Sequence, residues 1–206
     1  MTVDVLERAA AGDPAGTLVL LHGRGADEHD LFPLLDALDP ERRLRGLTPG
    51  GPLALPPGGR HWYQLAGIPT PDAGTFWPSF EALSALLDGL APPLVLGGFS
   101  QGAVMSYALA LGRGPDQRPA ALLPLSGFMP RVDGLELDLT GLDGYPVAIA
   151  HGSLDPVISV EWSREARDAL TTAGADITYD EAPLPHTIDP RVVPKLRDFV
   201  ASAVDR

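Results

Sequence analysis

The sequence contains no cysteine. Disulfide bonds, thiolate catalysis and cysteine-based zinc sites are therefore excluded. No run approaches the roughly 20 apolar residues that a helix needs to cross a bilayer. The segment 1–11 carries Asp4, Glu7 and Arg8 and lacks the apolar run of a secretory signal. These absences predict a soluble, cytoplasmic protein.

Positive charge is also scarce, because 15 Lys and Arg stand against 27 Asp and Glu, for a formal net charge of −12. A field of this sign repels phosphate backbones and anionic lipid surfaces, so neither nucleic acid nor a membrane is expected as a stable partner. The 22 prolines and 23 glycines are spread between apolar runs and indicate turns. Because 45% of the residues are apolar, we expect residues 1–206 to form one domain with a full core.

Short apolar runs alternate with amphipathic stretches along the chain. Strands are predicted at 17–21, 44–48, 94–98, 121–125, 147–150 and 177–180, with an antiparallel edge strand at 3–6. Helical periodicity follows most of these runs. This alternation is typical of an α/β fold, in which a mostly parallel sheet is covered by helices on both faces. Ligands in such folds bind beyond the carboxyl ends of the strands.

Capping residues suggest where two of the helices begin. One helix is predicted at 80–90, with Ser79 as its cap and a stop at Pro92-Pro93. The last helix is predicted to begin with Asp189 as its cap and Pro190 at its first position.

The segment Gly98-Phe99-Ser100-Gln101-Gly102 matches the pattern G-x-S-x-G, with a predicted strand before it and a helix after it. In this context the tight turn presents the serine hydroxyl at the carboxyl edge of the sheet, and glycine fits where a side chain would meet backbone. The dipole of the following helix favours negative charge there. The alternative is a glycine-rich loop whose serine only caps a helix. The context favours Ser100 as a nucleophile.

A serine nucleophile needs a base, and histidine is the usual one near neutral pH. Hydrolases of this type order their triad as Ser, acid, His, and only His151 and His186 follow Ser100. His186 lies in a loop between the last strand and the last helix, so it is the predicted base. His151 ends an apolar strand and is expected to have a structural role.

The acid should lie between Ser100 and His186 in the chain. Asp155 follows a strand end in a turn stiffened by Pro156, where a carboxylate can orient the imidazole. A turn or capping aspartate is the alternative reading. Three further carboxylates are alternatives but lie too close to His186 in sequence: Asp180, Glu181 and Asp189.

Acyl transfer also needs donors that stabilise the oxyanion. The N–H of Gln101, directly after the nucleophile, is one candidate. The N–H of Arg24 is the other, because it lies in the glycine-containing loop after the strand 17–21. A metal cluster of His22, Asp27, His29 and Asp30 is a rival interpretation of this loop, but the spacing matches no known ligand pattern. No metal or cofactor is expected.

Together these segments resemble the small carboxylesterase/phospholipase family of α/β-hydrolases, which includes bacterial carboxylesterases and acyl-protein thioesterases. The matching segments are 21–27, 98–102, 125–128, 151–158 and the loop that holds His186. The resemblance implies an α/β-hydrolase fold without a large cap domain. It also implies a triad of Ser100, Asp155 and His186, with the amides of Arg24 and Gln101 as the oxyanion hole. Pro185 departs from the family, which usually has glycine before this histidine.

Five aromatic residues are candidates for an acyl pocket: Trp62 and Tyr63 of the stretch 61–63, which also resembles a family feature, and Phe76, Trp77 and Phe128. Aromatic residues in such numbers are as often part of the core.

The predicted activity is hydrolysis of short- to medium-chain acyl esters through an acyl-enzyme, with small-molecule esters as partners. A thioesterase or lysophospholipase acting on longer chains is the alternative, because the same triad serves any acyl carbonyl. A non-catalytic binding protein with a hydrolase fold is a more distant one. A homodimer is compatible with either.

Overall fold

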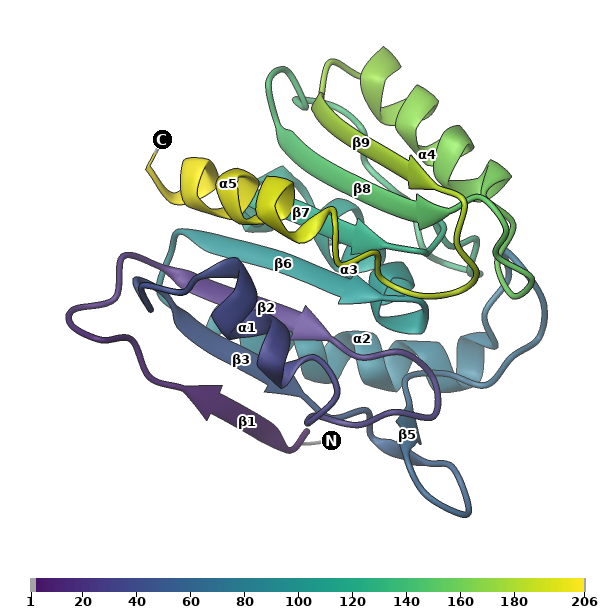
Figure 1. Cartoon of the computed structure of the whole chain (residues 1–206). Coiled ribbons are helices and arrows are strands. Elements are labelled where there is room, and N and C mark those ends of the chain that lie inside the picture. Colours follow the sequence, from purple (N-terminus) through teal and green to yellow (C-terminus); the bar gives the residue numbers. More distant parts are fainter. Residues whose placement is uncertain (1–2, 206) are drawn as a thin grey trace.

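The computed structural model describes residues 3–205, and its centre is a seven-stranded sheet of order β1-β3-β2-β6-β7-β8-β9 (Figure 1). Only β1 runs antiparallel to its neighbour; all other pairs are parallel. The strands are β1 (Val5–Arg8), β2 (Thr17–Leu21), β3 (Arg45–Pro49), β6 (Leu94–Phe99), β7 (Ala121–Leu125), β8 (Pro146–Gly152) and β9 (Asp176–Ala182). A separate hairpin joins β4 (Leu53–Ala54) to β5 (Arg60–His61).

Helices cover both faces of this sheet. The helices are α1 (Phe32–Leu38), α2 (Ala73–Asp88), α3 (Gln101–Gly112), α4 (Glu161–Thr172) and α5 (Val193–Val204), with a 3₁₀ turn at Pro115–Gln117. Helices α1 and α5 pack on one face, in front of the sheet in Figure 1, and α2, α3 and α4 pack on the other.

The alternation of side chains in β2 explains why two helical layers are needed. Leu18 and Leu20 belong to the core under α1 and α5, whereas Val19 and Leu21 belong to the core under α2 and α3. All four side chains are fully buried. A strand that is apolar on both faces is stable only when both are covered, and the predicted α/β architecture is confirmed.

The helix predicted at 80–90 begins earlier than expected, so this prediction is wrong. Helix α2 starts at Ala73, and its cap is Asp72, whose carboxylate accepts a hydrogen bond from the N–H of Thr75 at 2.9 Å. Pro78 lies inside the helix. Ser79 is not the cap; its buried hydroxyl donates to the carbonyl of Trp62 at 2.5 Å. The tertiary packing of α2 outweighs the cost of an internal proline.

The last helix begins later than predicted. Asp189 accepts a hydrogen bond from the N–H of Arg191 at 2.9 Å and so starts a turn. The helix itself runs from Val193 with Val192 as its cap residue, and its early proline is Pro194, not Pro190. The motif Asp-Pro favours turns as well as helix starts, and here the turn precedes the helix. The edge strand predicted at 3–6 is found at β1, slightly further along the chain.

Six parallel strands end at one edge of the sheet: β3, β2, β6, β7, β8 and β9. Over residues 3–205 no large cap domain covers this edge. Within the same residues, none of the helices combines the length and the apolar character that crossing a bilayer requires. The carboxyl edge is therefore open to a ligand.

Candidate active site

Ser100 stands on a sharp turn between β6 and α3. Its backbone has φ 54° and ψ −118°, a strained conformation for a residue with a side chain. A Cβ at Gly102 would lie 1.9 Å from the carbonyl oxygen of Leu21, and one at Gly98 would lie 2.5 Å from the backbone of Gly102. The strand and the helix therefore approach too closely for any side chain at these two positions. The turn leaves Ser100 at the carboxyl edge of the sheet.

The structure brings His186 to Ser100 from 86 residues further along the chain. Imidazole Nε2 lies 2.8 Å from Ser100 Oγ, within hydrogen-bond distance. The ring packs against Phe99, with 4.8 Å between ring centroids. A Cβ at Gly152 would lie within 2.4 Å of the carbonyl oxygens of Leu184 and Pro185. Glycine at the end of β8 thus lets the loop before His186 lie directly against the sheet.

Asp155 holds the other side of the imidazole. Its Oδ2 lies 2.5 Å from His186 Nδ1, and its Oδ1 accepts hydrogen bonds from the N–H groups of Val157 and Ile158 at 2.8 and 2.9 Å. The side chain is fully buried. Burial alone would raise the pKa of Asp155, but the hydrogen bonds from His186 and the two amides outweigh it and lower that pKa. Asp155 is therefore an ionised acceptor that keeps the Nδ1 hydrogen of His186 in place.

His151 does more than fill the strand end, where the sequence predicts a structural role. Its Nε2 lies 3.2 Å from Asp155 Oδ2 and 2.9 Å from the carbonyl oxygen of Ile158. Its Nδ1 lies 2.5 Å from Ser163 Oγ. The sequence gives no signal for this contact, because Ser163 lies on α4 and meets His151 only through the tertiary fold.

The two candidate oxyanion donors lie beside the nucleophile. Gln101 is the first residue of α3, so its N–H has no acceptor within the helix. Arg24 follows Gly23, where a Cβ would lie 3.4 Å from Ser100 Cβ. The loop after β2 therefore lies against the nucleophile, and both Arg24 and Gln101 line the same pocket as Ser100.

A hydrogen-bond network fixes the loop after β2, which carries the candidate oxyanion donor Arg24 and is called the oxyanion loop from here on. His22 Nε2 accepts from the N–H of Gly51 at 2.8 Å, so its Nδ1 carries the hydrogen and donates to the carbonyl of Gly23 at 2.7 Å. Burial lowers the pKa of His22 and favours this neutral form. The indole of Trp62 donates to the carbonyl of His22 at 2.9 Å. The side-chain amide of Gln101 accepts a hydrogen bond from the backbone N–H of Trp62 through Oε1 and donates one to the carbonyl of Tyr63 through Nε2.

A cavity of about 420 Å³ opens beside Ser100 and His186. Its apolar wall is formed by Tyr63, Leu65, Ile68, Phe128, Val157 and Ile158. Of the five aromatic residues predicted for an acyl pocket, the structure brings Tyr63 and Phe128 to this cavity. The other wall residues come from loops, where sequence periodicity gives no direction for a side chain.

The other three aromatic residues lie elsewhere. Trp62 and Phe76 are fully buried in the core between the sheet and α2. Trp77 packs edge-on against Phe76 and Phe80, and its indole donates to the carbonyl of Asp133 at 3.1 Å. Trp62 supports the oxyanion loop, as described above, and Phe76 and Trp77 stabilise α2.

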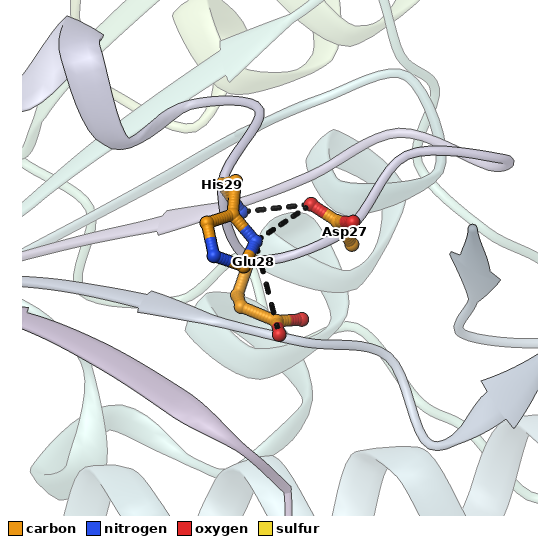
Figure 2. Close-up of side chains that lie close together, drawn as sticks. All are labelled: Asp27, Glu28 and His29. Atoms are coloured by element: carbon orange, nitrogen blue, oxygen red, sulfur yellow. Dashed lines mark hydrogen bonds and ion pairs between the residues drawn. The ribbon is translucent and has the colours of Figure 1, made fainter. Parts of the chain in front are cut away.

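The rival metal cluster in the oxyanion loop is only partly assembled. Asp27, Glu28 and His29 place side-chain ligand atoms within 4.8 Å of one another (Figure 2). His29 Nδ1 lies 3.2 Å from Asp27 Oδ1, and both side chains are exposed. Both ring nitrogens of His22 are engaged by Gly23 and Gly51, and neither His22 nor Asp30 belongs to this group. An exposed acidic group of this kind needs no metal, and its ion pairs are sufficient to explain it.

Comparison with known proteins shows to which family the chain belongs. The model of the Phospholipase/Carboxylesterase family matches residues 8–204. The chain belongs to this family. Membership identifies the chain as a serine hydrolase of carboxylic esters, in agreement with the resemblance seen in its motifs.

Relatives of this phospholipase/carboxylesterase protein include esterases and thioesterases. Acyl-protein thioesterase 1 of Debaryomyces hansenii is 25% identical, and the match covers 81% of each chain. The carboxylesterase of Bacillus cereus has the same fold, with a TM-score of 0.83 at 24% identity, over 98% of this chain and 94% of that one. Acyl-protein thioesterase 2 of Zea mays shares it too, with a TM-score of 0.76 at 21% identity, over 98% and 99%.

Proposed function

We propose that this protein hydrolyses short- to medium-chain acyl esters, with Ser100 as nucleophile, His186 as general base and Asp155 as the group that orients the base. One observation carries the proposal: His186 lies 2.8 Å from Ser100 Oγ while its other nitrogen lies 2.5 Å from a buried carboxylate. This arrangement turns a weak hydroxyl into a nucleophile.

In the first half-reaction, Ser100 Oγ attacks the acyl carbonyl and gives its proton to His186 Nε2. The carbonyl oxygen becomes an oxyanion, which accepts hydrogen bonds from the N–H groups of Arg24 and Gln101. Asp155 stabilises the imidazolium that forms. His186 then protonates the leaving alcohol, and the acyl group remains bound to Ser100 as an ester.

In the second half-reaction, His186 takes a proton from a water molecule, which attacks the acyl-enzyme carbonyl. The same two amides hold the second oxyanion. His186 returns the proton to Ser100 Oγ as the carboxylic acid leaves. This chemistry needs no cofactor, and we propose that the protein acts without one, as a single domain in the cytoplasm.

The shape of the cavity favours acyl groups of modest length. Leu65, Ile68 and Val157 lie in its wall yet are 63%, 41% and 58% exposed, so they form an open apolar rim. A short or medium chain can lie within this wall. A long chain would extend past the rim into water and gain little further burial.

Ester length discriminates the proposal from its alternative. We expect kcat/KM for p-nitrophenyl esters to be highest between C2 and C8 and to fall towards palmitate. The measurement is initial-rate kinetics over the acetate-to-palmitate series, followed by a palmitoyl thioester. Faster turnover of the palmitoyl thioester than of every short ester would favour a thioesterase instead. In that case the exposed apolar rim would be the surface that binds the long chain.

Covalent labelling separates an enzyme from an inert binding protein. A fluorophosphonate probe is expected to modify the protein once per chain, at Ser100, because only an activated serine reacts with it. Mass spectrometry of the labelled peptide reads out the site. An unlabelled chain that hydrolyses none of the esters would leave only the binding-protein interpretation. Light scattering on the same sample tests whether the protein forms a homodimer.

A further inference from the structure

Arg24 stands apart from every other cation that the structure describes. Within residues 3–205, each other Lys or Arg side chain makes a hydrogen bond or an ion pair, most of them with a carboxylate. Arg24 makes neither with any described residue, and its side chain is exposed. In a chain with a net charge of −12, a cation without an acidic neighbour is unexpected.

The position of Arg24 indicates a role for this unpaired charge. It lines the cavity that contains Ser100 and His186, and the wall around it is otherwise mainly apolar. Two acids of its own loop pair with other residues: Asp27 with His29, and Glu28 with Arg60, at 3.4 Å. Over residues 3–205, neither these acids nor Asp30 forms an ion pair with the Arg24 guanidinium.

We propose that the Arg24 guanidinium binds an anionic group of the substrate, so that the preferred esters carry a carboxylate or a phosphate. This inference rests on the proposed esterase function. A planar guanidinium offers two parallel N–H donors that match either group. In the proposed mechanism the N–H of Arg24 binds the oxyanion, so the anion must lie within one arginine side chain of the scissile carbonyl. It can belong to the acyl part or to the alcohol part.

Matched esters test the proposal and separate the two sources. Monomethyl glutarate carries its carboxylate on the acyl part, and its neutral amide is the control. 2-(Phosphonooxy)ethyl butyrate carries a phosphate on the alcohol part, and 2-hydroxyethyl butyrate is the control. We expect kcat/KM of at least one anionic ester to exceed that of its control by about 10-fold, the effect of one charge-assisted pair.

Arg24→Gln keeps the backbone N–H and removes the charge. In this variant the anionic-to-neutral ratio should fall to about 1 or below, whereas Arg24→Lys should retain part of it. Ratios of 1 or below for both pairs in the native protein, or ratios that Arg24→Gln leaves unchanged, would overturn the proposal while the esterase function stands. Failure to hydrolyse any of the four esters would count against the esterase function itself.

A second inference rests on separate contacts, those of His151. The carbonyl of Ile158 can only accept a hydrogen bond, so the hydrogen of His151 is on Nε2, where it is shared with Asp155 Oδ2. Burial lowers the pKa of His151 and keeps the ring neutral. The ring therefore accepts at Nδ1 from the hydroxyl of Ser163. Both His151 and Asp155 have fully buried side chains.

We infer that His151 is a positioning residue for Asp155. Oδ1 is fixed by two backbone amides, whereas Oδ2 lies 2.5 Å from His186 Nδ1 and 3.2 Å from His151 Nε2. Without His151, Oδ2 loses one of these two nitrogen contacts, and the carboxylate orients His186 less tightly. Misalignment of the base lowers the rate of the chemical step and leaves ester binding nearly unchanged.

Two variants separate positioning from mere packing. We expect His151→Leu to lower kcat per active site about 10- to 100-fold with KM changed less than about threefold. His151→Gln, whose amide N–H can reach Asp155, should restore much of the loss. Titration with the fluorophosphonate probe counts folded sites, so partial unfolding does not imitate the effect. Equal kcat per site in His151→Leu and native protein would refute the role, as would a loss in His151→Gln as large as in His151→Leu.

If His151→Leu does not fold, Ser163→Ala gives the same information. That variant keeps the imidazole and removes the hydroxyl that fixes its rotation, so kcat per site should fall by a smaller factor with KM preserved. Unchanged kcat in a folded Ser163→Ala variant would overturn the proposed positioning role of His151.

Discussion

Replacing Ser100 by alanine is expected to lower kcat for ester hydrolysis by about 10⁴- to 10⁶-fold, because no other group can form the acyl-enzyme. KM should change little, since the apolar wall and the oxyanion donors remain. Steady-state kinetics with p-nitrophenyl butyrate measure both quantities. The melting temperature should change little, because alanine keeps the Cβ at this turn and only the contact of the hydroxyl with His186 is lost.

The matched control is Ser106→Ala. Ser106 is another buried serine of α3, and its hydroxyl donates to the carbonyl of Ala103 at 2.8 Å, outside the cavity. That variant should keep kcat within a few fold. His186→Ala should lose as much as Ser100→Ala, and the double variant little more, because members of a triad act as a unit. Near-native turnover in Ser100→Ala would remove the basis of the proposed mechanism.

Replacing Gly102 by alanine should have the largest effect on folding. The added Cβ would lie 1.9 Å from the carbonyl oxygen of Leu21 and 2.6 Å from that of His22, and neither backbone atom can rotate away. Helix α3 must shift from β2, so we expect the free energy of unfolding to fall by about 3 kcal/mol or more. For a chain of this length that lowers the melting temperature by about 6–12 °C.

Gly12→Ala is the control for this effect, because an added Cβ there meets nothing within 4 Å. Its melting temperature should differ from that of the native protein by no more than about 2 °C. Calorimetry of the three proteins gives the comparison. A Gly102→Ala variant that melts with the native protein would mean that the strand and helix lie further apart than described.

The nucleophile could be predicted from sequence because its requirements are local. A strand, a turn without room for side chains and a helix leave their marks within Gly98–Gly102, and the structure has each of them. His186 and Asp155 were predicted from the order of the triad along the chain, and the structure brings both to Ser100. Their roles in catalysis stay a prediction until activity is measured.

Helix starts and pocket walls were harder to predict, for physical reasons. Asp72 and Ser79 are both residue types that favour the N-cap position of a helix. The packing of Phe76 in the core makes Asp72 the N-cap of α2. Likewise, the sequence marks Trp62 as aromatic but not as the donor to His22 that stabilises the oxyanion loop. Such contacts depend on which loops meet at the sheet edge, and no local periodicity encodes that meeting.

The order of Ser100 and His186 along the chain has a consequence for the nascent protein on the ribosome. Ser100, the proposed nucleophile, lies near the middle of the sequence, 86 residues before His186, the proposed base, which follows the edge strand β9. A growing chain that ends before His186 therefore carries Ser100 as an ordinary hydroxyl, which does not react with esters. The Ser100 hydroxyl becomes reactive only after β9 has joined the sheet and His186 is in place. A growing chain therefore cannot be acylated at Ser100 before it has the base that releases the acyl group.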